Sequence, residues 1–423
     1  MKFRRCVVAI VIAVISVSVL PVHAKSSIKK GETIKIGVIG PMALRTGAHM
    51  IITAEMGMLP YNTSGGIEIN GSRHNVELIK IDSNEFQNVA DAAAGAERAI
   101  SKNGIHFLVG GVLDEAVAVI QEIAADNELI YINTAYTVNE NHIKHLRNDY
   151  DHYKYCFTTA SAAPTALATA HIGIIETISD AVKEAGVKKP KVAQLVAKSR
   201  PGDAIIGLTT KVFPAKGMEI VGDWRPSNQA ADLRAETAAI KSSHPNIIYA
   251  VFSGSAGLVF GKQVNELKIP AIVGESPASS LFPGQGIDYS VTMMGPQSIS
   301  CKISEKNVAF YHEFLKRSNN ELCVINAYDA VAFLLKAVQQ AGSLKADRII
   351  KILETETWSA IAGDMTYDPK YHKTKFLNNF RPVYGVQKLP GGKQSIVWPT
   401  EKTAVAAQKV SIPEWIKESW EKM

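Results

Sequence analysis

The chain has 423 residues, of which 46% are hydrophobic and 20% are charged, and its formal net charge is +6 at pH 7. This length predicts two domains on the usual size of a domain. So mild a positive surplus predicts no nucleic-acid partner, because nucleic-acid-binding domains concentrate far more basic charge.

Residues 1–24 have the pattern of a secretory signal. A basic start precedes an apolar run over residues 7–20, Pro21 ends that run, and a small residue follows at Ala24. The run of about 14 residues is short of the ~20 needed to span a bilayer, which argues against a retained anchor. We therefore expect cleavage after Ala24 and an exported protein. The mature chain keeps 399 residues (423 minus 24) and a formal charge of +3, once three basic residues are lost.

Residues 34–111 show strand, helix, strand, helix and strand in turn, each strand apolar on both faces. Strands of this kind lie inside a parallel sheet that is covered by helices on both sides. The fold class is therefore α/β, and the alternation continues to about residue 294. The expected strands are residues 34–39, 76–81, 107–109, 129–133, 191–196, 219–224, 247–252, 271–274 and 292–294, with helices such as 90–101, 116–125 and 231–241 between them.

The alternation breaks twice, and each break predicts a crossing between domains. The first break covers residues 153–164 and the second covers residues 295–302. Helices are expected after the second break over residues 307–318, 327–341 and 347–355, with Gly342 ending the middle one. Beyond Ile361 the period changes to two, which predicts strands and a final hairpin turning at residues 390–392.

Three cysteines remain after the signal is removed: Cys156, Cys301 and Cys323. An odd number in an exported protein leaves at least one free thiol and allows one disulfide. The sequence does not determine which pair would form it.

The motifs of the common enzyme classes are missing from the sequence. The first expected strand is followed by Gly37-Val-Ile-Gly40-Pro41 in place of the dinucleotide pattern, and Pro41 lacks the N–H that a phosphate would need. Ser253 stands where a nucleophile elbow requires its first glycine. We therefore expect no enzyme, no catalytic residue and no cofactor.

A metal site is the other chemistry to consider. His142 and His145 are spaced i, i+3, and His152 follows them. Polar and charged residues surround all three, so a solvated surface segment is the preferred interpretation, and we expect no metal.

Several segments together resemble a known family. They are IKIGVIGPM, GGIEING, VELIKIDS, FLVGG and YINTAYT in the first half, and NAYDAVAFLLKAVQQAGS, GDMTYDP and GGKQSIVWP in the second. With these segments the chain resembles the type I periplasmic binding proteins of the branched-chain amino-acid transporters, the leucine/isoleucine/valine-binding group. The resemblance covers nearly the whole mature chain.

The resemblance implies two doubly wound, Rossmann-like lobes that are joined by three crossovers. Residues 33–156 plus 300–358 are expected to form the N-terminal lobe, and residues 157–299 plus 359–423 the C-terminal lobe. A protein of this kind binds a small molecule between its lobes and delivers it to the permease of an ABC importer. We expect a monomer that binds an amino acid or a similar small polar metabolite. The alternative is a sensor of the same fold that passes ligand state to a signalling partner.

The ligand site of an open α/β sheet lies outside the carboxyl ends of its strands. This rule selects the loops at residues 42–47, 111–115, 134–137, 199–203, 253–256 and 275–277. The resemblance places Ala135 and Thr137 in a loop that binds the ligand carboxylate, and Glu275 at the acid that binds the amino group. A carboxylate at this position pairs well with an ammonium group once water leaves.

The chain also departs from the family pattern. Asp114 stands where a serine pair is usual and would repel a ligand carboxylate. Arg200 replaces an aromatic residue, and the small residues Ser253 and Ser255 lie where a tyrosine is often found. Arg45 in the first loop and Arg200 could each hold a carboxylate as a fork, with Asp114 and Glu275 taking donors. Alternatively, Arg45 and Asp114 pair with each other and only shape the site.

Overall fold

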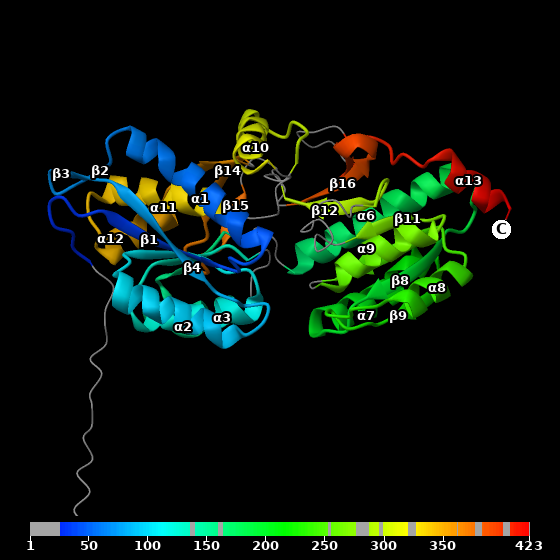
Figure 1. Cartoon of the computed structure of the whole chain (residues 1–423), viewed down its shortest axis with the longest axis horizontal. Helices are drawn as coiled ribbons and strands as arrows, with labels where there is room; N and C mark the ends of the chain where they lie inside the picture. Colours follow the sequence, from blue (N-terminus) through cyan, green and yellow to red (C-terminus); the bar gives the residue numbers. More distant parts are fainter. Residues whose placement is uncertain are drawn as a thin grey trace, which may run out of the picture.

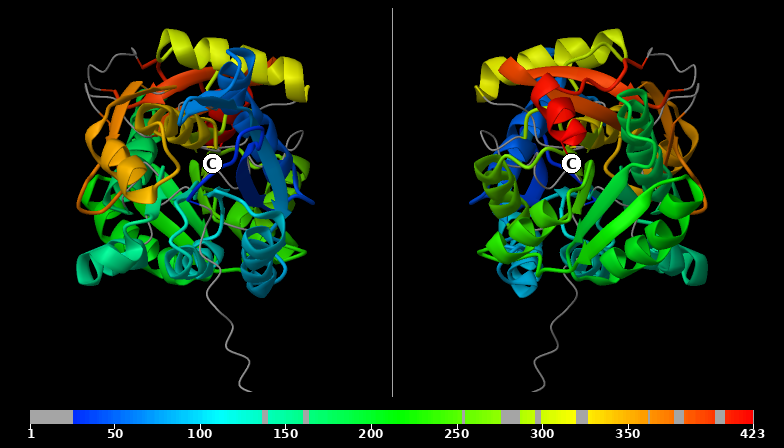
Figure 2. Two further views of the ribbon diagram at one scale, coloured as in Figure 1. Left: turned by 90° about the vertical axis from the view of Figure 1, so that its left-hand side faces the viewer. Right: turned by 90° about the vertical axis from the view of Figure 1, so that its right-hand side faces the viewer.

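The computed structural model describes residues 26–135, 140–159, 164–252, 255–275, 287–295, 299–319, 327–361, 363–376, 383–400 and 407–422. These residues form two lobes that lie end to end along the longest axis of the molecule (Figure 1). The lobes overlap when the molecule is viewed along that axis (Figure 2). None of the helices in the described part of the chain combines the length and the apolar character needed to cross a bilayer.

The first lobe contains a five-stranded sheet in the order β4-β1-β5-β6-β7, and all four pairings are parallel. A short hairpin, β2 and β3, follows its first helix. The elements of this lobe before the first crossover are β1 (Ile34–Gly40), α1 (Arg45–Thr63), β2 (Ile67–Ile69), β3 (Ser72–His74), β4 (Val76–Asp82), α2 (Val89–Arg98) with a π-helical turn (Ala99–Asn103), β5 (Phe107–Gly110), α3 (Asp114–Asp126), β6 (Tyr131–Asn133), α4 (Glu140–Asn148), α5 (Tyr150–Tyr153) and β7 (Cys156–Thr158).

Helices cover both faces of this sheet, as the apolar strands predicted. In β1, Ile36 and Val38 enter a core that is shared with α1 and with two helices from later in the chain, α11 (Ala327–Ala341) and α12 (Ala346–Thr355). Ile39 enters the opposite core, which is shared with α2 and α3. Burial on both faces explains why the strands read as continuous apolar runs.

The second lobe contains a seven-stranded sheet in the order β17-β16-β12-β11-β10-β8-β9. The hairpin of β16 and β17 is antiparallel and also pairs antiparallel with β12, and the remaining pairings are parallel. The elements of this lobe are α6 (Pro164–Glu184), β8 (Lys191–Val196), α7 (Arg200–Ala215), β9 (Glu219–Trp224), α8 (Arg234–Ser242), β10 (Ile247–Val251), α9 (Ala256–Leu267), β11 (Ile272–Glu275), β12 (Val291–Met294), β16 (Tyr384–Leu389), a 3-10 turn (Pro390–Gly392), β17 (Lys393–Trp398) and α13 (Glu414–Glu421).

Helices again cover both faces. Strand residues such as Val192 and Tyr249 pack on one face with α6, α7 and α13, and Ile248 packs on the other face with α8 and α9. Both lobes are therefore doubly wound, which confirms the expected fold class.

The chain crosses between the sheets three times. It leaves the first lobe after β7, returns to that lobe after β12 and leaves again after β15 (Thr374–Phe376), the last strand of a separate three-stranded sheet. The first two crossings lie at the two predicted breaks. One correction applies to the first break, because residues 156–158 form the last strand of the first sheet. Three residues are too few to show a period in the sequence.

Between its return and the last crossing, the chain adds a second set of elements to the first lobe. They are α10 (Glu305–Ser318), α11 (Ala327–Ala341), α12 (Ala346–Thr355), β13 (Trp358–Ala360), β14 (Gly363–Tyr367) and β15 (Thr374–Phe376). The boundary expected at residue 358 differs from this packing. Ala360, Met365 and Tyr367 share the core of α1 and α11, so residues 358–367 pack with the first lobe instead of the second.

Buried His372 and its neighbour Lys373 join the chain segment before the first crossover to the segment before the third. The His372 carbonyl accepts the Thr158 N–H at 2.9 Å, and Thr158 pairs with Lys373 as an isolated parallel bridge. The His372 ring is fully buried against Phe157, with its Nε2 2.9 Å from Glu354 Oε1 and its Nδ1 3.2 Å from the Cys156 carbonyl oxygen. The strand before the first crossover is thereby fixed to the strand before the third.

Of the three cysteines, Cys156 is buried and Cys301 is half-buried, and both are free thiols. The described residues therefore contain no disulfide, and Cys323 lies outside them.

Candidate functional site

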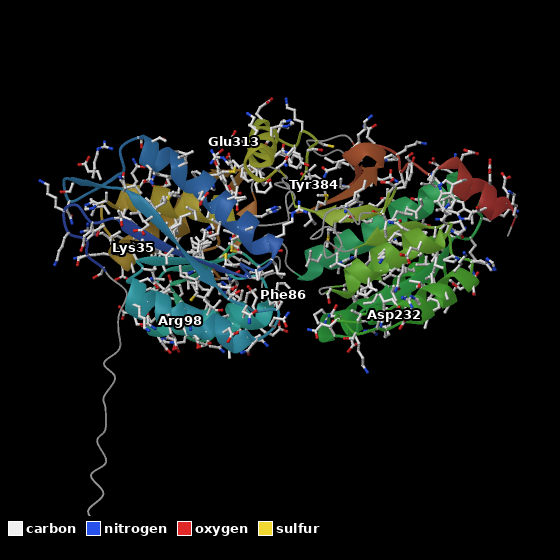
Figure 3. All side chains as sticks on the ribbon, viewed as in Figure 1. Lys35, Phe86, Arg98, Asp232, Glu313 and Tyr384 are labelled. Carbon is white, nitrogen blue, oxygen red and sulfur yellow. The ribbon has the colours of Figure 1, made fainter. Side chains whose placement is uncertain are left out.

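The carboxyl ends of the parallel strands in both lobes lie on the sides that face each other. In the first lobe β7 ends at Thr158, and the first crossover follows. In the second lobe β12 ends at Met294 opposite Tyr384, where β16 begins after the third crossover. Figure 3 places Phe86, four residues after β4, on the side of the first lobe that faces the second, and Tyr384 on the facing side of the second lobe. We call these two sides the first-lobe edge and the second-lobe edge.

The strand ends of the first-lobe edge are aligned in register. Gly40 lies opposite Asp82, Ile39 lies opposite Gly110, and Gly110 lies opposite Asn133. Gly110 has a φ of +130°, and a Cβ there would stand 2.0 Å from the Ile39 carbonyl oxygen. Only glycine therefore allows β5 to end so close to β1.

Two carboxylates that follow β4 bind the main chain of neighbouring loops. Asp82 Oδ1 accepts the Met42 N–H at 3.0 Å, in the loop between β1 and α1. Glu85 Oε2 accepts the N–H groups of Val112 and Leu113 at 3.0 and 2.6 Å, at the start of α3. Both acids are thus acceptors for amides that would otherwise be open at this edge.

Glu85 is almost fully buried, with 2% of its surface exposed. Its second oxygen accepts the Ser83 hydroxyl at 2.8 Å. Burial raises the pKa of Glu85, and its hydrogen bonds from Leu113, Ser83 and Val112 act against that rise.

In the other half of the first-lobe edge, Asn133 accepts hydrogen bonds from two threonine hydroxyl groups. Its Oδ1 accepts the Thr158 hydroxyl at 2.9 Å, and its carbonyl oxygen accepts the Thr159 hydroxyl at 3.0 Å. The Thr134 hydroxyl donates to the Gly111 carbonyl oxygen at 3.1 Å. These hydroxyl groups bind main-chain or amide acceptors and fix the loops after β5, β6 and β7.

Arg45, the first residue of α1, has a partner that the sequence did not reveal. Its Nε–H donates to His49 Nε2 at 3.2 Å, one helical turn later. His49 is buried and packs edge-on against Phe314 of α10, with ring centroids 4.8 Å apart. Burial, and then the charge of Arg45, lower the pKa of His49 to about 4, so the imidazole is neutral and accepts from the guanidinium.

The second-lobe edge contains an ion pair. Arg225, directly after β9, donates from Nε to the Val196 carbonyl oxygen at 2.8 Å, at the end of β8. Its guanidinium also lies 2.7 Å from Asp203 Oδ1, in the first turn of α7. Ser199 caps the same helix by accepting the Gly202 N–H at 3.1 Å.

The structure describes some of the predicted site residues in full and others in part or not at all. Arg45 and Asp114 begin α1 and α3 on the first-lobe edge, and buried Ala135 follows β6. On the second-lobe edge Arg200 begins α7, Ser255 is exposed at the N-cap of α9, and Glu275 ends β11. The side chains of Arg200 and Glu275, and the whole of Thr137 and Ser253, lie outside the described residues.

The prediction from sequence missed Asp82, Glu85, His49 and Arg225. Asp82 and Arg225 directly follow expected strands, at residues 76–81 and 219–224, and Glu85 lies in the loop after the first of these. Applying the strand-end rule to those two strands would have found all three. His49 lies inside a helix and carried no signal.

The three histidines considered for a metal have other contacts. His142 is buried with Nε2 2.9 Å from the Tyr371 carbonyl oxygen. His145 lies 3.4 Å from Glu122, and His152 lies 3.5 Å from Asp126. The described part of the chain holds no group of three His, Cys, Asp or Glu side chains that is arranged to bind a metal.

A cavity of about 410 Å³ lies away from both edges, between α1, α10 and α11. Its lining includes Met56, Phe310 and Tyr328, with Glu313 and Arg317 from α10. It contains none of the predicted ligand-binding residues.

A family model described as "Periplasmic binding protein" matches residues 33–387, which include the first sheet, all three crossovers and the second sheet as far as β16. The chain belongs to the periplasmic binding protein family. Members of this family are extracytoplasmic solute-binding proteins. No curated protein matches the sequence.

Solved structures share the fold at low identity. The LivJ branched-chain amino acid binding protein of Streptococcus pneumoniae, in complex with isoleucine, has a TM-score of 0.67 and 17% identity, over 87% of this chain and 100% of that one. A solute binding protein of an ABC transporter from Rhodopseudomonas palustris, in complex with 3,4-dihydroxybenzoic acid, has a TM-score of 0.64 and 19% identity, over 90% and 99%.

An amino acid ABC transporter substrate-binding protein from Pseudomonas fluorescens has a TM-score of 0.65 and 13% identity, over 91% of this chain and 98% of that one. The fold is therefore shared by proteins in complex with chemically different ligands, isoleucine in one and 3,4-dihydroxybenzoic acid in another.

Proposed function

We propose that this periplasmic binding protein captures an amino acid or a similar small polar metabolite between its two edges and delivers it to the permease of an ABC importer. Residues 1–24 direct the export and are cleaved after Ala24. The protein acts as a monomer and performs no covalent chemistry.

The observation that supports this proposal most strongly is the facing arrangement of the two edges. Each edge has charged or polar groups at the carboxyl ends of parallel strands, where open α/β sheets bind ligands. The chain passes between the lobes three times, so the lobes are joined by three crossovers. A ligand that contacts both edges favours the closed arrangement by the difference between its affinities for the closed and open forms.

The proposed binding residues come from both lobes. Arg45, Asp114, Ala135 and Thr137 belong to the first, and Arg200, Ser253, Ser255 and Glu275 belong to the second. The ends of α1, α3, β6, α7, α9 and β11 lie at the two edges, which supports this assignment. A site split in this way is complete only when the lobes close.

A thermal-shift screen of amino acids, dicarboxylates and aromatic acids tests the proposal. A ligand at 100 times its Kd stabilises the folded state by about 2.7 kcal/mol. We expect one chemical class to raise the melting temperature, and Glu275→Ala to abolish the response to an amine-bearing ligand of that class. Glu266→Ala, an exposed acid on α9, is the matched control. A melting temperature unchanged by every class would contradict the solute-binding proposal, and an unchanged response in Glu275→Ala would remove Glu275 from the site.

A further inference from the structure

A carboxylate of the protein itself, Glu85, accepts the two main-chain N–H groups that lead into α3. A helix that begins directly after a buried parallel strand presents main-chain N–H groups and the positive end of its dipole. Here β5 ends at Gly110 and α3 begins at Asp114. The N–H groups of Val112 and Leu113, between them, both donate to Glu85.

The geometry of Glu85 is that of a bound carboxylate. One oxygen takes the two amides at 3.0 and 2.6 Å, and the other takes the Ser83 hydroxyl at 2.8 Å. Only 2% of the residue is exposed, so solvent does not compete for these donors. A ligand carboxylate reaching this place would find three donors already taken.

In two neighbouring loops, main-chain N–H groups also donate to an acid of the protein. Asp82 accepts the Met42 N–H at 3.0 Å in the loop after β1 and the Asn84 N–H at 3.1 Å in its own loop. The loops on both sides of the β1 end are therefore satisfied by acids that follow β4. Asp114 and Glu115 add two more acids in the first turn of α3. This part of the edge disfavours an anion and favours a group that donates hydrogen bonds.

We propose that Glu85 is a specificity-determining residue that excludes ligand carboxylates from the start of α3, so that the ligand presents a hydrogen-bond donor, an ammonium or hydroxyl group, to this part of the first lobe. This inference rests on the proposed solute-binding function, because it assigns a ligand class to that same site. Any carboxylate on the ligand then points elsewhere, toward Arg45 or the second lobe.

Acetate tests the inference without knowledge of the ligand. Replacing Glu85 by Ala removes the atoms of one acetate, so acetate can refill the space and accept from Val112 and Leu113. At pH 7 and constant ionic strength, 100 mM acetate is expected to raise the melting temperature of Glu85→Ala by about 2 °C or more. Wild type, Glu85→Gln and the exposed-acid control Glu97→Ala should not respond beyond a chloride reference, and acetamide should not replace acetate. No acetate response in Glu85→Ala, or an equal response in wild type, would overturn the proposal.

A second readout covers poor folding of Glu85→Ala. If that variant is recovered mainly as aggregate, refolding in acetate should raise its soluble yield over refolding in chloride, and equal yields would count against the proposal.

Leucine and leucinamide then test the ligand class. Relative to wild type, Glu85→Ala should shift the preference between the two probes toward leucine; an unchanged preference would refute the role of Glu85 in excluding carboxylates. A lack of response to both probes in every variant would count against the amino-acid part of the proposed function, while the acetate result would still decide the role of Glu85.

Discussion

The charged groups of the two edges differ in burial and in the kind of main-chain group that they bind. On the first-lobe edge, Glu85 is buried and accepts main-chain N–H groups at the start of a helix. On the second-lobe edge, Arg225 donates to a main-chain carbonyl at the end of a strand, and its pair with Asp203 leaves 24% and 67% of the two side chains exposed. Buried charges with fixed partners make a rigid surface, whereas a half-exposed ion pair responds to salt and solvent. We infer that the first edge is preformed and that the second can adjust to a ligand.

The largest effect should come from the tight strand ends of the first-lobe edge. In Gly110→Ala, the new Cβ meets the Ile39 carbonyl oxygen at a φ that L residues rarely adopt. We expect a loss of about 4 kcal/mol in the free energy of unfolding, measured by urea denaturation. Gly207→Ala on α7 is the control, because a Cβ there has nothing within 4 Å, and it should be neutral or slightly stabilising. Equal losses in the two variants would show that the first edge is no tighter than an open helix surface.

The sequence predicted the sheets better than the edges. Strands such as residues 191–196 were found with their observed ends because burial on both faces leaves a continuous apolar run. The pairing of Glu85 with Val112 and Leu113 joins residues 27 and 28 positions apart. Hydrogen bonds to the main chain leave no residue preference at the amide end, so a single sequence cannot reveal them. Arg225 was recoverable from its place after a strand, but its Asp203 partner was not.

The next effect concerns the pair formed by Glu354 and His372, beside the crossovers. Burial opposes the ionisation of Glu354, but hydrogen bonds from His372 and Tyr150 outweigh it and lower the pKa of Glu354. A lowered pKa gives stability that is present above the ordinary glutamate pKa and is lost as the pH falls through the folded value. Glu354→Gln weakens hydrogen bonds to a charged group and should therefore cost roughly 2–3 kcal/mol at pH 7, and the difference from wild type should shrink below about pH 4.5. Asp203→Asn is the second-lobe counterpart and should cost far less; a difference that does not change between pH 7 and pH 3 would argue against an ionised Glu354.

A smaller effect is expected from His49. Because the pKa of His49 is lowered to about 4, the unfolded state binds a proton more readily than the folded state between about pH 6.5 and 4. Stability should fall as the pH is lowered through this window, by about 2 kcal/mol between pH 7 and 5 from this residue. His49→Gln keeps an acceptor for Arg45 and does not titrate, so urea denaturation at the two pH values should show a correspondingly smaller loss. The same loss as in wild type would mean that His49 is not the group responsible.

The smallest effect should come from the second-lobe edge. Arg225→Ala removes one hydrogen bond and a half-exposed ion pair, and we expect a loss of about 1 kcal/mol. Asp203→Asn isolates the ionic part, which should fall toward zero between 50 mM and 500 mM NaCl. A loss of several kcal/mol that is insensitive to salt would place this edge in the same rigid class as the first.

The three crossovers have a practical consequence for observing the protein at work. An odd number of crossings leaves the two described ends of the chain in different lobes. Ser26 precedes Ile28, which packs against the core of the first lobe, and Lys422 follows α13, whose Ile416 and Trp420 pack into the core of the second lobe. Both end residues are exposed. One fluorophore attached at each end would therefore report the separation of the lobes by energy transfer, with no probe inside the binding region and no change to either free internal thiol.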